Sequence, residues 1–509
     1  CMCFLLGIDI GTTGTKAVII TERGKLAGKA TAEYPLLTPK PNWAEQHPGE
    51  WWRATKKVIT MITRTAKVKP HEIKGIGLSG QMHGSVFLDR KNNAIRPAIL
   101  WCDQRTQAEC DEITSTFGFK DLLKLTCNPA LTGFTAPKIL WLRKHEPRHW
   151  EKVRKILLPK DYIRFLLTGE FATEVSDASG TLLFDVKSRR WSERVLKALD
   201  VPKEFLPESY ESFEVSGRIS RHAAEETGLA EGTPVVGGGG DQAAGAVGNG
   251  IVRRGIISSV IGTSGVLFAF SEQPEYDLQG RLHTFCHAVL GKWHMMGVTL
   301  AAGGSFRWLR DALCQEEVAL ARRKKVDPYE LMTAKAAEVS PGSEGLIFLP
   351  YMIGERTPYP DPDARGVFLG LTLRHTKAHL IRSVMEGVTF SLRDSLEIMK
   401  SLKTPITEIR ASGGGGKSKL WRQMQADVFN ADVVTVNIDE GPAFGVALLA
   451  GVGAGINSTV EEACESAIRV TSRTSPNSRR AQAYEERYQI YHALYPLLRE
   501  KFQQIASLS

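Results

Sequence analysis

Two short apolar segments joined by a glycine and threonine turn open the chain. Residues 3–10 and 16–20 are mostly apolar, and residues 11–14 read Gly-Thr-Thr-Gly. Apolar runs of this length with glycine between them predict two buried strands that form a hairpin. The same order recurs at residues 260–270, where residues 261–265 read Ile-Gly-Thr-Ser-Gly. One copy in each half of the chain indicates a duplicated domain.

Strand and helix patterns alternate between and after these hairpins. Short apolar runs predict strands, and apolar residues spaced three and four apart predict helices. The expected strands include 25–34, 73–78, 85–88, 233–236, 293–298 and 408–412, and the expected helices include 49–66, 136–144, 161–167, 377–400, 417–429, 443–451 and 479–502. This alternation predicts the α/β class. We place the domain boundary at the glycine-rich residues 248–255, which gives domains 1–248 and 249–509.

Composition and charge are those of an ordinary globular protein. The 65 basic and 56 acidic residues give a net charge of +9 without a long run of Lys or Arg, so we expect no nucleic-acid partner. No stretch reaches the roughly 18 apolar residues of a membrane span, so we expect no membrane partner either. Eight scattered cysteines without zinc-site spacing indicate reduced thiols and a cytoplasmic protein.

Two aspartates follow predicted strands beside glycine-rich turns. Asp9 ends the first strand, next to a turn whose backbone N–H groups and hydroxyls can surround a phosphate. Asp241 follows the strand 233–236 and four glycines. A third glycine-rich turn, residues 413–416, lacks the spacing of a Walker motif, which excludes that class of NTPase. Three such turns favour a nucleotide held across a cleft, with Asp9 holding a cation beside its phosphates.

Five motifs occur in the order found in one kinase family. They are Gly7-Ile8-Asp9-Ile10-Gly11-Thr12-Thr13, Gly80-Gln81-Met82-His83-Gly84, Gly239-Gly240-Asp241-Gln242-Ala243, Ile261-Gly262-Thr263-Ser264 and Ser412-Gly413-Gly414-Gly415. Through them almost the whole chain resembles the FGGY carbohydrate kinases, within the group that shares the fold of actin and hexokinase. The segments around Met82, Trp101 and Pro137 are most similar to the xylulokinases. The resemblance implies two ribonuclease-H-like domains flanking a cleft, the first binding a sugar and the second ATP.

The resemblance also implies roles for individual residues. Asp241 is the implied catalytic base, and Asp9 the residue that positions Mg²⁺, through water, and the transferring phosphoryl group. The implied sugar contacts are Gln81, Met82, His83, Asp241 and Gln242, and the implied ATP contacts are Thr12, Thr13, Gly262, Thr263, Gly303, Gly414 and Ser418. Phosphoryl transfer requires in-line positioning, stabilised charge and a proton acceptor, and this set supplies each of them.

The implied reaction is the phosphorylation of a ketopentose, D-xylulose to D-xylulose 5-phosphate, with MgATP. Two alternatives stay open: a family member acting on ribulose or another sugar or polyol, and an actin-like ATPase switch without a sugar substrate. Arg307 and Ser418 differ from the Gln and Asn of the glycerol kinases, which argues against glycerol. Core packing is the plain alternative for Met82, and a hydrogen-bonded turn is the alternative for His83.

A few residues keep structural or open interpretations. Trp43, Trp101 and Asp103 are candidates either for the sugar pocket or for loop packing. The plain interpretation of Glu355-Arg356 and of the Lys417 side chain is that they are surface groups in salt bridges. The final amphipathic helix, 479–502, leaves two alternatives, a cover for its own domain or the contact of a homodimer.

Overall fold

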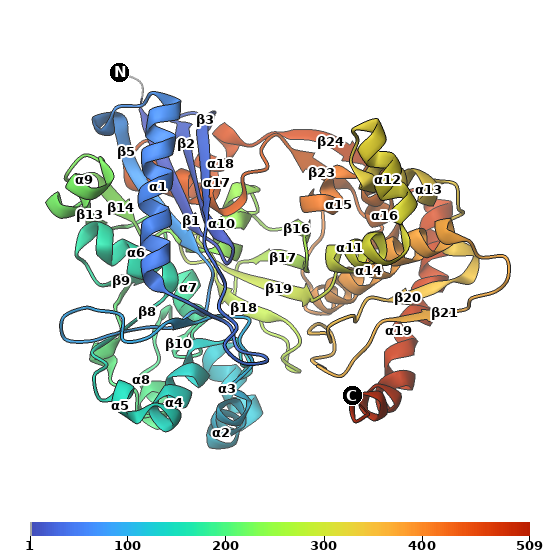
Figure 1. Cartoon of the computed structure of the whole chain (residues 1–509), viewed down its shortest axis with the longest axis horizontal. Coiled ribbons are helices and arrows are strands. Elements are labelled where there is room, and N and C mark those ends of the chain that lie inside the picture. The colour runs from blue at the N-terminus through green and yellow to red at the C-terminus, as the bar shows by residue number, and fades with distance from the viewer. Residues whose placement is uncertain (1–2, 509) are drawn as a thin grey trace.

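Two seven-stranded sheets form the centres of two lobes (Figure 1). The computed structural model describes residues 3–508. The sheet of the first lobe has the order β13-β14-β5-β1-β2-β3, with β15 as a further strand beside β5. Its strands are β1 (Phe4–Ile10), β2 (Gly14–Thr21), β3 (Leu26–Glu33), β5 (Ile73–Gly80), β13 (Val215–Arg218), β14 (Pro234–Val236) and β15 (Gly239–Gly240).

The sheet of the second lobe repeats this topology, in the order β18-β19-β17-β16-β22-β23-β24. In each sheet the first strand of an antiparallel hairpin has a parallel neighbour, β5 beside β1 and β22 beside β16. The strands are β16 (Ile256–Ile261), β17 (Gly265–Ser271), β18 (His283–Cys286), β19 (Trp293–Thr299), β22 (Glu408–Ser412), β23 (Val433–Val436) and β24 (Val470–Thr474). The duplicated α/β fold predicted from the two hairpins is confirmed.

Helices and shorter strands surround the two sheets. The helices are α1 (Pro48–Ala66), α2 (Gln107–Phe117), α3 (Phe119–Thr126), α4 (Thr135–His145), α5 (Pro147–Trp150), α6 (Pro159–Thr168), α7 (Val175–Ser179), α8 (Glu193–Ala198), α9 (Arg221–Thr227), α10 (Asp241–Gly248), α11 (Gly303–Leu313), α12 (Gln315–Lys324), α13 (Pro328–Ala337), α14 (Lys377–Ser401), α15 (Gly413–Lys417), α16 (Lys419–Phe429), α17 (Gly441–Gly453), α18 (Val460–Ala467) and α19 (Ser478–Ala506). The shorter strands are β4 (Glu45–Gln46), β6 (Val86–Leu88), β7 (Ala98–Ile99), β8 (Lys155–Leu157), β9 (Ala172–Glu174), β10 (Phe184–Asp185), β11 (Arg190–Trp191), β12 (Glu208–Tyr210), β20 (Ile347–Leu349) and β21 (Val367–Leu369).

Individual residues determine where two of the helices begin. Helix α1 begins at Pro48, where the missing N–H of proline costs no hydrogen bond. The helix predicted over 417–429 starts later, at Lys419, because the Ser418 hydroxyl accepts a hydrogen bond from the N–H of Trp421 and so caps α16. The glycines before it form the separate short helix α15.

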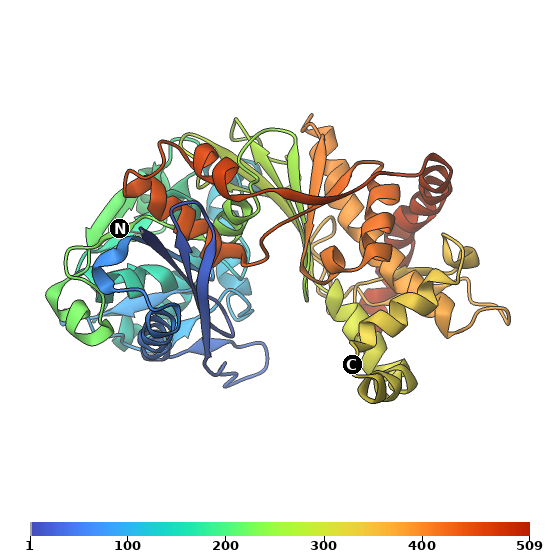
Figure 2. The ribbon, with the colours of Figure 1, turned by 90° about the horizontal axis from the view of Figure 1, so that it is seen from above.

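One helix from the second half of the chain lies in the first lobe. Helix α17 packs against β1, β5 and α10, and α18 packs beside it, as the orange-red helices over the blue strands show in Figure 2. Small residues permit this close approach: a Cβ on Gly445 would overlap the carbonyl oxygen of Ala244, and one on Gly77 would overlap that of Val446. The domains 1–248 and 249–509 stay a prediction. The sequence did not predict that α17 returns to pack on the first lobe.

The final helix, α19, covers its own lobe. Its buried residues are Tyr484, Tyr488, Tyr491, Leu494, Tyr495 and Phe502, which belong to the apolar core of the second lobe together with α14. The first of the two alternatives for this helix is therefore realised, and a homodimer stays a prediction. Among residues 3–508, no helix is long and apolar enough to cross a membrane.

Candidate active site

Two carboxylates lie at adjacent strand ends of the first lobe. Asp9 is near the end of β1 and lies opposite Ser79 of the parallel strand β5. Asp241 begins α10 directly after β15, whose Gly240 lies opposite Gly80 at the end of β5. Because the carboxyl ends of parallel strands meet at one edge of a sheet, the topology brings the two carboxylates to the same place.

Burial controls the protonation of both aspartates. It raises the pKa of Asp9 to about 6, against the opposing effects of the neighbouring Ser79 hydroxyl and the positive charge of Lys16. Burial and, to a smaller extent, the negative charge of Asp9 together raise the pKa of Asp241 to about 7. A carboxyl group with a pKa near neutrality is suited to exchange protons in a reaction.

Glycine is required before Asp241 for two separate reasons. Gly238 has φ +73°, and a Cβ there would overlap the carbonyl oxygen of Leu78, so the loop can run flush against β5 only without a side chain. A Cβ on Gly240 would lie 3.0 Å from the sulfur of Met82. The glycines therefore let both β5 and Met82 come close to the strand end that carries Asp241.

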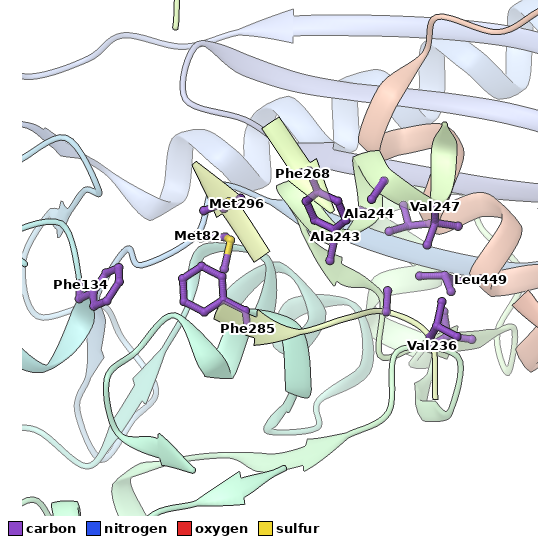
Figure 3. Packing of buried hydrophobic residues seen from close by; sticks show 14 of the residues in the cluster. Met82, Phe134, Val236, Ala243, Ala244, Val247, Phe268, Phe285, Met296 and Leu449 are labelled. Carbon is purple, nitrogen blue, oxygen red and sulfur yellow. The ribbon is translucent and has the colours of Figure 1, made fainter. Parts of the chain in front are cut away.

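A cavity of about 250 Å³ joins Asp241 to the predicted sugar contacts. It is lined by residues of both lobes: Met82, His83, Trp101, Leu131, Gly133, Phe134, Asp241, Gln242, Ser264, Val266, Met296, Val298 and Arg356. We call it the sugar-side cavity. Met82 also belongs to the apolar cluster shown in Figure 3, with Phe134, Phe285 and Met296. The structure thus brings Met82, His83, Asp241 and Gln242 together, as the sequence predicts.

His83 presents a neutral imidazole to this cavity. Burial lowers the pKa of His83 well below its ordinary value, so the ring is uncharged at neutral pH. Its Nδ1 lies 2.6 Å from the carbonyl oxygen of Gly180, and because a carbonyl only accepts, Nδ1 carries the proton. Phe134 stacks on the ring with centroids 4.7 Å apart. The remaining nitrogen, Nε2, is left as a hydrogen-bond acceptor.

Gln81 does not line the sugar-side cavity, in contrast to the sequence prediction. It is 1% exposed, and its Nε2 donates to Gln46 Oε1 at 2.9 Å. The Thr12 hydroxyl donates to Gln81 Oε1 at 3.3 Å and accepts from Trp101 Nε1 at 2.9 Å. Gln81 therefore fixes the first Gly/Thr turn, because both ends of its amide are used within the protein. Trp101, by contrast, lines the cavity.

Trp43 and Asp103 support loops. Asp103 is 1% exposed, accepts from the N–H of Ala44 at 2.7 Å and forms an ion pair with Arg105. The Arg105 guanidinium lies 3.4 Å from the ring centroid of Trp43, a cation–π contact. The loop-packing alternative is therefore the one that the structure supports for both residues.

The second lobe holds a larger cavity of about 460 Å³. Five of the predicted ATP contacts line it: Gly262, Thr263, Gly303, Gly414 and Ser418. Residues without a sequence signal complete it, among them Phe306, Tyr329, Thr333 and Trp421. Their types are common in apolar cores, so only their position identifies them. Thr12 and Thr13 lie outside this lining, at the hairpin of the first lobe, where Thr13 is exposed.

A third cavity, of about 300 Å³, is lined by residues of both halves of the chain, among them Lys16 and Gly413. Asp241 and Gln242 line it as well as the sugar-side cavity. Lys16 lines this cavity and forms an ion pair with Glu440 at 2.6 Å. The two residues are far apart in the chain, so no local sequence pattern predicts this pair. Asp241 therefore lines both the sugar-side cavity and the third cavity, which Gly413 of a glycine-rich turn also lines.

No group of three or more metal-ligating side chains occurs within residues 3–508. The Oδ1 atom of Asp9 is nevertheless buried without a hydrogen-bond partner in the described chain. A single carboxylate of this kind fits a magnesium ion that takes its other ligands from water and phosphate oxygens.

The comparison with known proteins agrees with this geometry. The models of the FGGY family of carbohydrate kinases match residues 4–248 for its N-terminal domain and 257–454 for its C-terminal domain. Two proteins of Bacillus subtilis (strain 168) are similar: a xylulose kinase, 37% identical with 97% of each chain covered, and a gluconokinase, 33% identical with 99% of this chain and 98% of the relative covered.

A solved structure extends the agreement to the fold. The crystal structure of a xyloylose kinase from Brucella ovis is 37% identical and has a TM-score of 0.89, with 98% of this chain and 99% of that chain covered. The family matches, the relatives and the two-lobed site lead to one conclusion: the chain belongs to the FGGY family of carbohydrate kinases.

Proposed function

We propose that this kinase transfers the γ-phosphoryl group of MgATP to D-xylulose and forms D-xylulose 5-phosphate. The position of Asp241 carries the proposal, because this residue lines both the sugar-side cavity and the cavity next to the glycine-rich turns. In this position the carboxylate accepts the proton of the sugar hydroxyl as it attacks the phosphoryl group. Membership of a carbohydrate kinase family sets aside the ATPase switch without a sugar substrate.

The sugar-side cavity supports a small polyhydroxylated substrate. Its volume is about 250 Å³, and it combines the apolar side chain of Met82 with polar groups of His83, Asp241 and Gln242. The sequence is somewhat closer to the Bacillus subtilis xylulose kinase than to its gluconokinase, which favours the pentulose over gluconate. Ribulose-type sugars are the alternative substrates within the same proposal.

The nucleotide side of the proposal rests on the larger cavity. The adenosine occupies this cavity, which Gly303 and Gly414 line together with the aromatic side chains of Phe306, Tyr329 and Trp421. The phosphates then extend toward the two Gly/Thr turns, including Thr12 and Thr13 of the first lobe. Asp9 is the residue that would hold Mg²⁺, through water, and the bound ion would supply positive charge to the phosphate oxygens. The side chains of the protein orient the sugar hydroxyl and take up its proton.

A substrate panel tests the proposal. ADP release with MgATP is measured for D-xylulose, D-ribulose, L-ribulose, L-xylulose, D-gluconate and glycerol. We expect the highest kcat/KM for D-xylulose and the lowest for glycerol. A clear preference for another sugar would refute the substrate, and equal ADP release with and without every sugar would refute the proposed transfer reaction.

The pKa of Asp241 predicts the pH dependence of the reaction. Burial raises this pKa to about 7, and only the ionised carboxylate can accept a proton. We therefore expect kcat/KM to fall about tenfold for each pH unit below this value and to level off above it, since kcat/KM reports the free enzyme. Initial rates at subsaturating D-xylulose across the neutral and mildly acid range measure the profile. A flat profile through pH values below 7 would contradict the role of Asp241 as base.

A further inference from the structure

Arg356 is an arginine in the sugar-side cavity whose side chain forms no ion pair or hydrogen bond with the described residues 3–508. It comes from the loop between β20 and β21 of the second lobe, and it lines the same cavity as Met82 and His83 of the first lobe. Its backbone N–H donates to Glu355 Oε1 at 2.8 Å. Its guanidinium makes no ion pair and no hydrogen bond with any residue between 3 and 508. The expectation of a surface salt bridge for the pair Glu355-Arg356 is therefore wrong.

The neighbours of Arg356 fix its place at the end of β19. Glu355 is 3% exposed, accepts from the N–H of Leu300 at 2.9 Å and from the hydroxyl of Thr299 at 2.7 Å. On the other side, the N–H of Thr357 donates to the carbonyl oxygen of Val298 at 3.0 Å. The carboxylate of Glu355 is thus used by other donors, and the guanidinium is held in the cavity by its flanking residues.

The surroundings of Arg356 only partly stabilise its positive charge. Burial lowers the pKa of Arg356 below its ordinary value, which shows that the surroundings disfavour the charged form. The side chain is half-buried, and its five N–H donors have no acceptor among residues 3–508, so they are available to a ligand in the cavity. Groups of this kind persist where a ligand supplies the missing partner.

The position of Arg356 indicates that it contacts the sugar and not the phosphates of ATP. The arginine lines the sugar-side cavity but is not among the residues that line the cavity around Lys16 and Gly413, toward which the phosphates extend. In the same cavity His83 offers an acceptor nitrogen, and the charge of Arg356 contributes to the lowered pKa of His83. A ligand with neighbouring oxygens between His83 and Arg356 would satisfy both.

We propose that Arg356 is a sugar-binding residue that the second lobe contributes, and that its guanidinium donates hydrogen bonds to neighbouring oxygens of the sugar held by Met82 and His83. The planar fork of arginine suits two adjacent oxygens better than the single ammonium of lysine. The sugar therefore contacts both lobes and links their relative position to its own binding. This inference rests on the proposed function, because it assumes that the cavity holds the sugar acceptor.

The test measures sugar binding directly, without nucleotide. Tryptophan fluorescence titrations with D-xylulose follow Trp101, which lines the cavity, in the wild-type protein and in Arg356→Gln, Arg356→Lys and Arg374→Gln. Arg374 is the matched control, since its side chain is 82% exposed in the same lobe. We expect Arg356→Gln to raise the Kd for D-xylulose about tenfold to a hundredfold, as loss of a charged hydrogen bond does, with partial rescue by Lys and no change in the control.

Stability and steady-state kinetics separate this role from a structural one. Because the guanidinium forms no hydrogen bond or ion pair with the residues that the structure describes, Arg356→Gln should leave the Tm unchanged or raise it, and the KM for ATP should change less than twofold. An unchanged Kd for D-xylulose in Arg356→Gln would overturn the inference. A lower kcat with an unchanged Kd would overturn it too, and would assign the guanidinium to the phosphoryl group. If the wild-type protein itself binds no pentulose, that result refutes the proposed function, whatever the variants do.

Discussion

Replacement of Asp241 by asparagine is expected to lower kcat by roughly 10²-fold to 10⁴-fold, the usual contribution of a positioned proton acceptor. Asparagine has nearly the same size and can occupy the first position of α10, so the cavity keeps its shape. The amide cannot accept the proton of the sugar hydroxyl. The loss should therefore lie in kcat, with the Kd for D-xylulose changed only a few-fold.

Steady-state rates with D-xylulose and MgATP, together with fluorescence titrations of the sugar, measure the two quantities separately. Asp200→Asn is a suitable control, because this side chain is 97% exposed and remote from the cavities. A kcat for Asp241→Asn within tenfold of the wild-type value would contradict the assignment of Asp241 as base.

The second large effect is expected at the contact between α10 and α17. A Cβ on Gly445 would overlap the carbonyl oxygen of Ala244 and lie 2.8 Å from the backbone nitrogen of Gly248. Backbone atoms cannot move aside as a flexible side chain can, so Gly445→Ala should destabilise the protein by about 3 kcal/mol, the upper end for overpacking. Because α10 begins with Asp241, a shift of this helix should also lower kcat.

Gly245→Ala on the facing helix provides the comparison. The nearest atom to a Cβ at this position is Cγ of Pro442 at 3.6 Å, an ordinary contact, and alanine is the better helix former by about 1 kcal/mol. Urea unfolding should therefore give a midpoint for Gly245→Ala at or above that of the wild type, and a clearly lower one for Gly445→Ala. Equal midpoints for the two variants would show that the helices are not packed as described.

Local sequence patterns were sufficient to predict the two sheets and the two carboxylates. Each hairpin has apolar runs on both sides of a glycine turn, and glycines directly precede Asp241, so the signal lies within a few residues. The position of α17 carries no such signal. Its small residues predict a closely packed helix, but its partners β1 and β5 lie in the other half of the chain.

Contacts between distant parts of the chain were also missed in the candidate active site. Gln81 belongs to the motif that resembles the sugar contacts, but its hydrogen bond to Gln46 depends on the way two distant loops meet. Arg356 follows a glutamate and precedes a threonine, an order typical of a surface loop. Only the fold shows that Glu355 is engaged by Thr299 and Leu300 and that the arginine is left without a partner.

The most direct test of the central claim follows the γ-phosphoryl group itself. A single turnover with ATP, Mg²⁺ and excess D-xylulose is stopped at successive times, and the products are identified by phosphorus NMR. The account predicts one D-xylulose 5-phosphate for each ADP, with inorganic phosphate formed only slowly, and neither product at an appreciable rate in Asp241→Asn. Release of inorganic phosphate at the same rate with and without the sugar would contradict it.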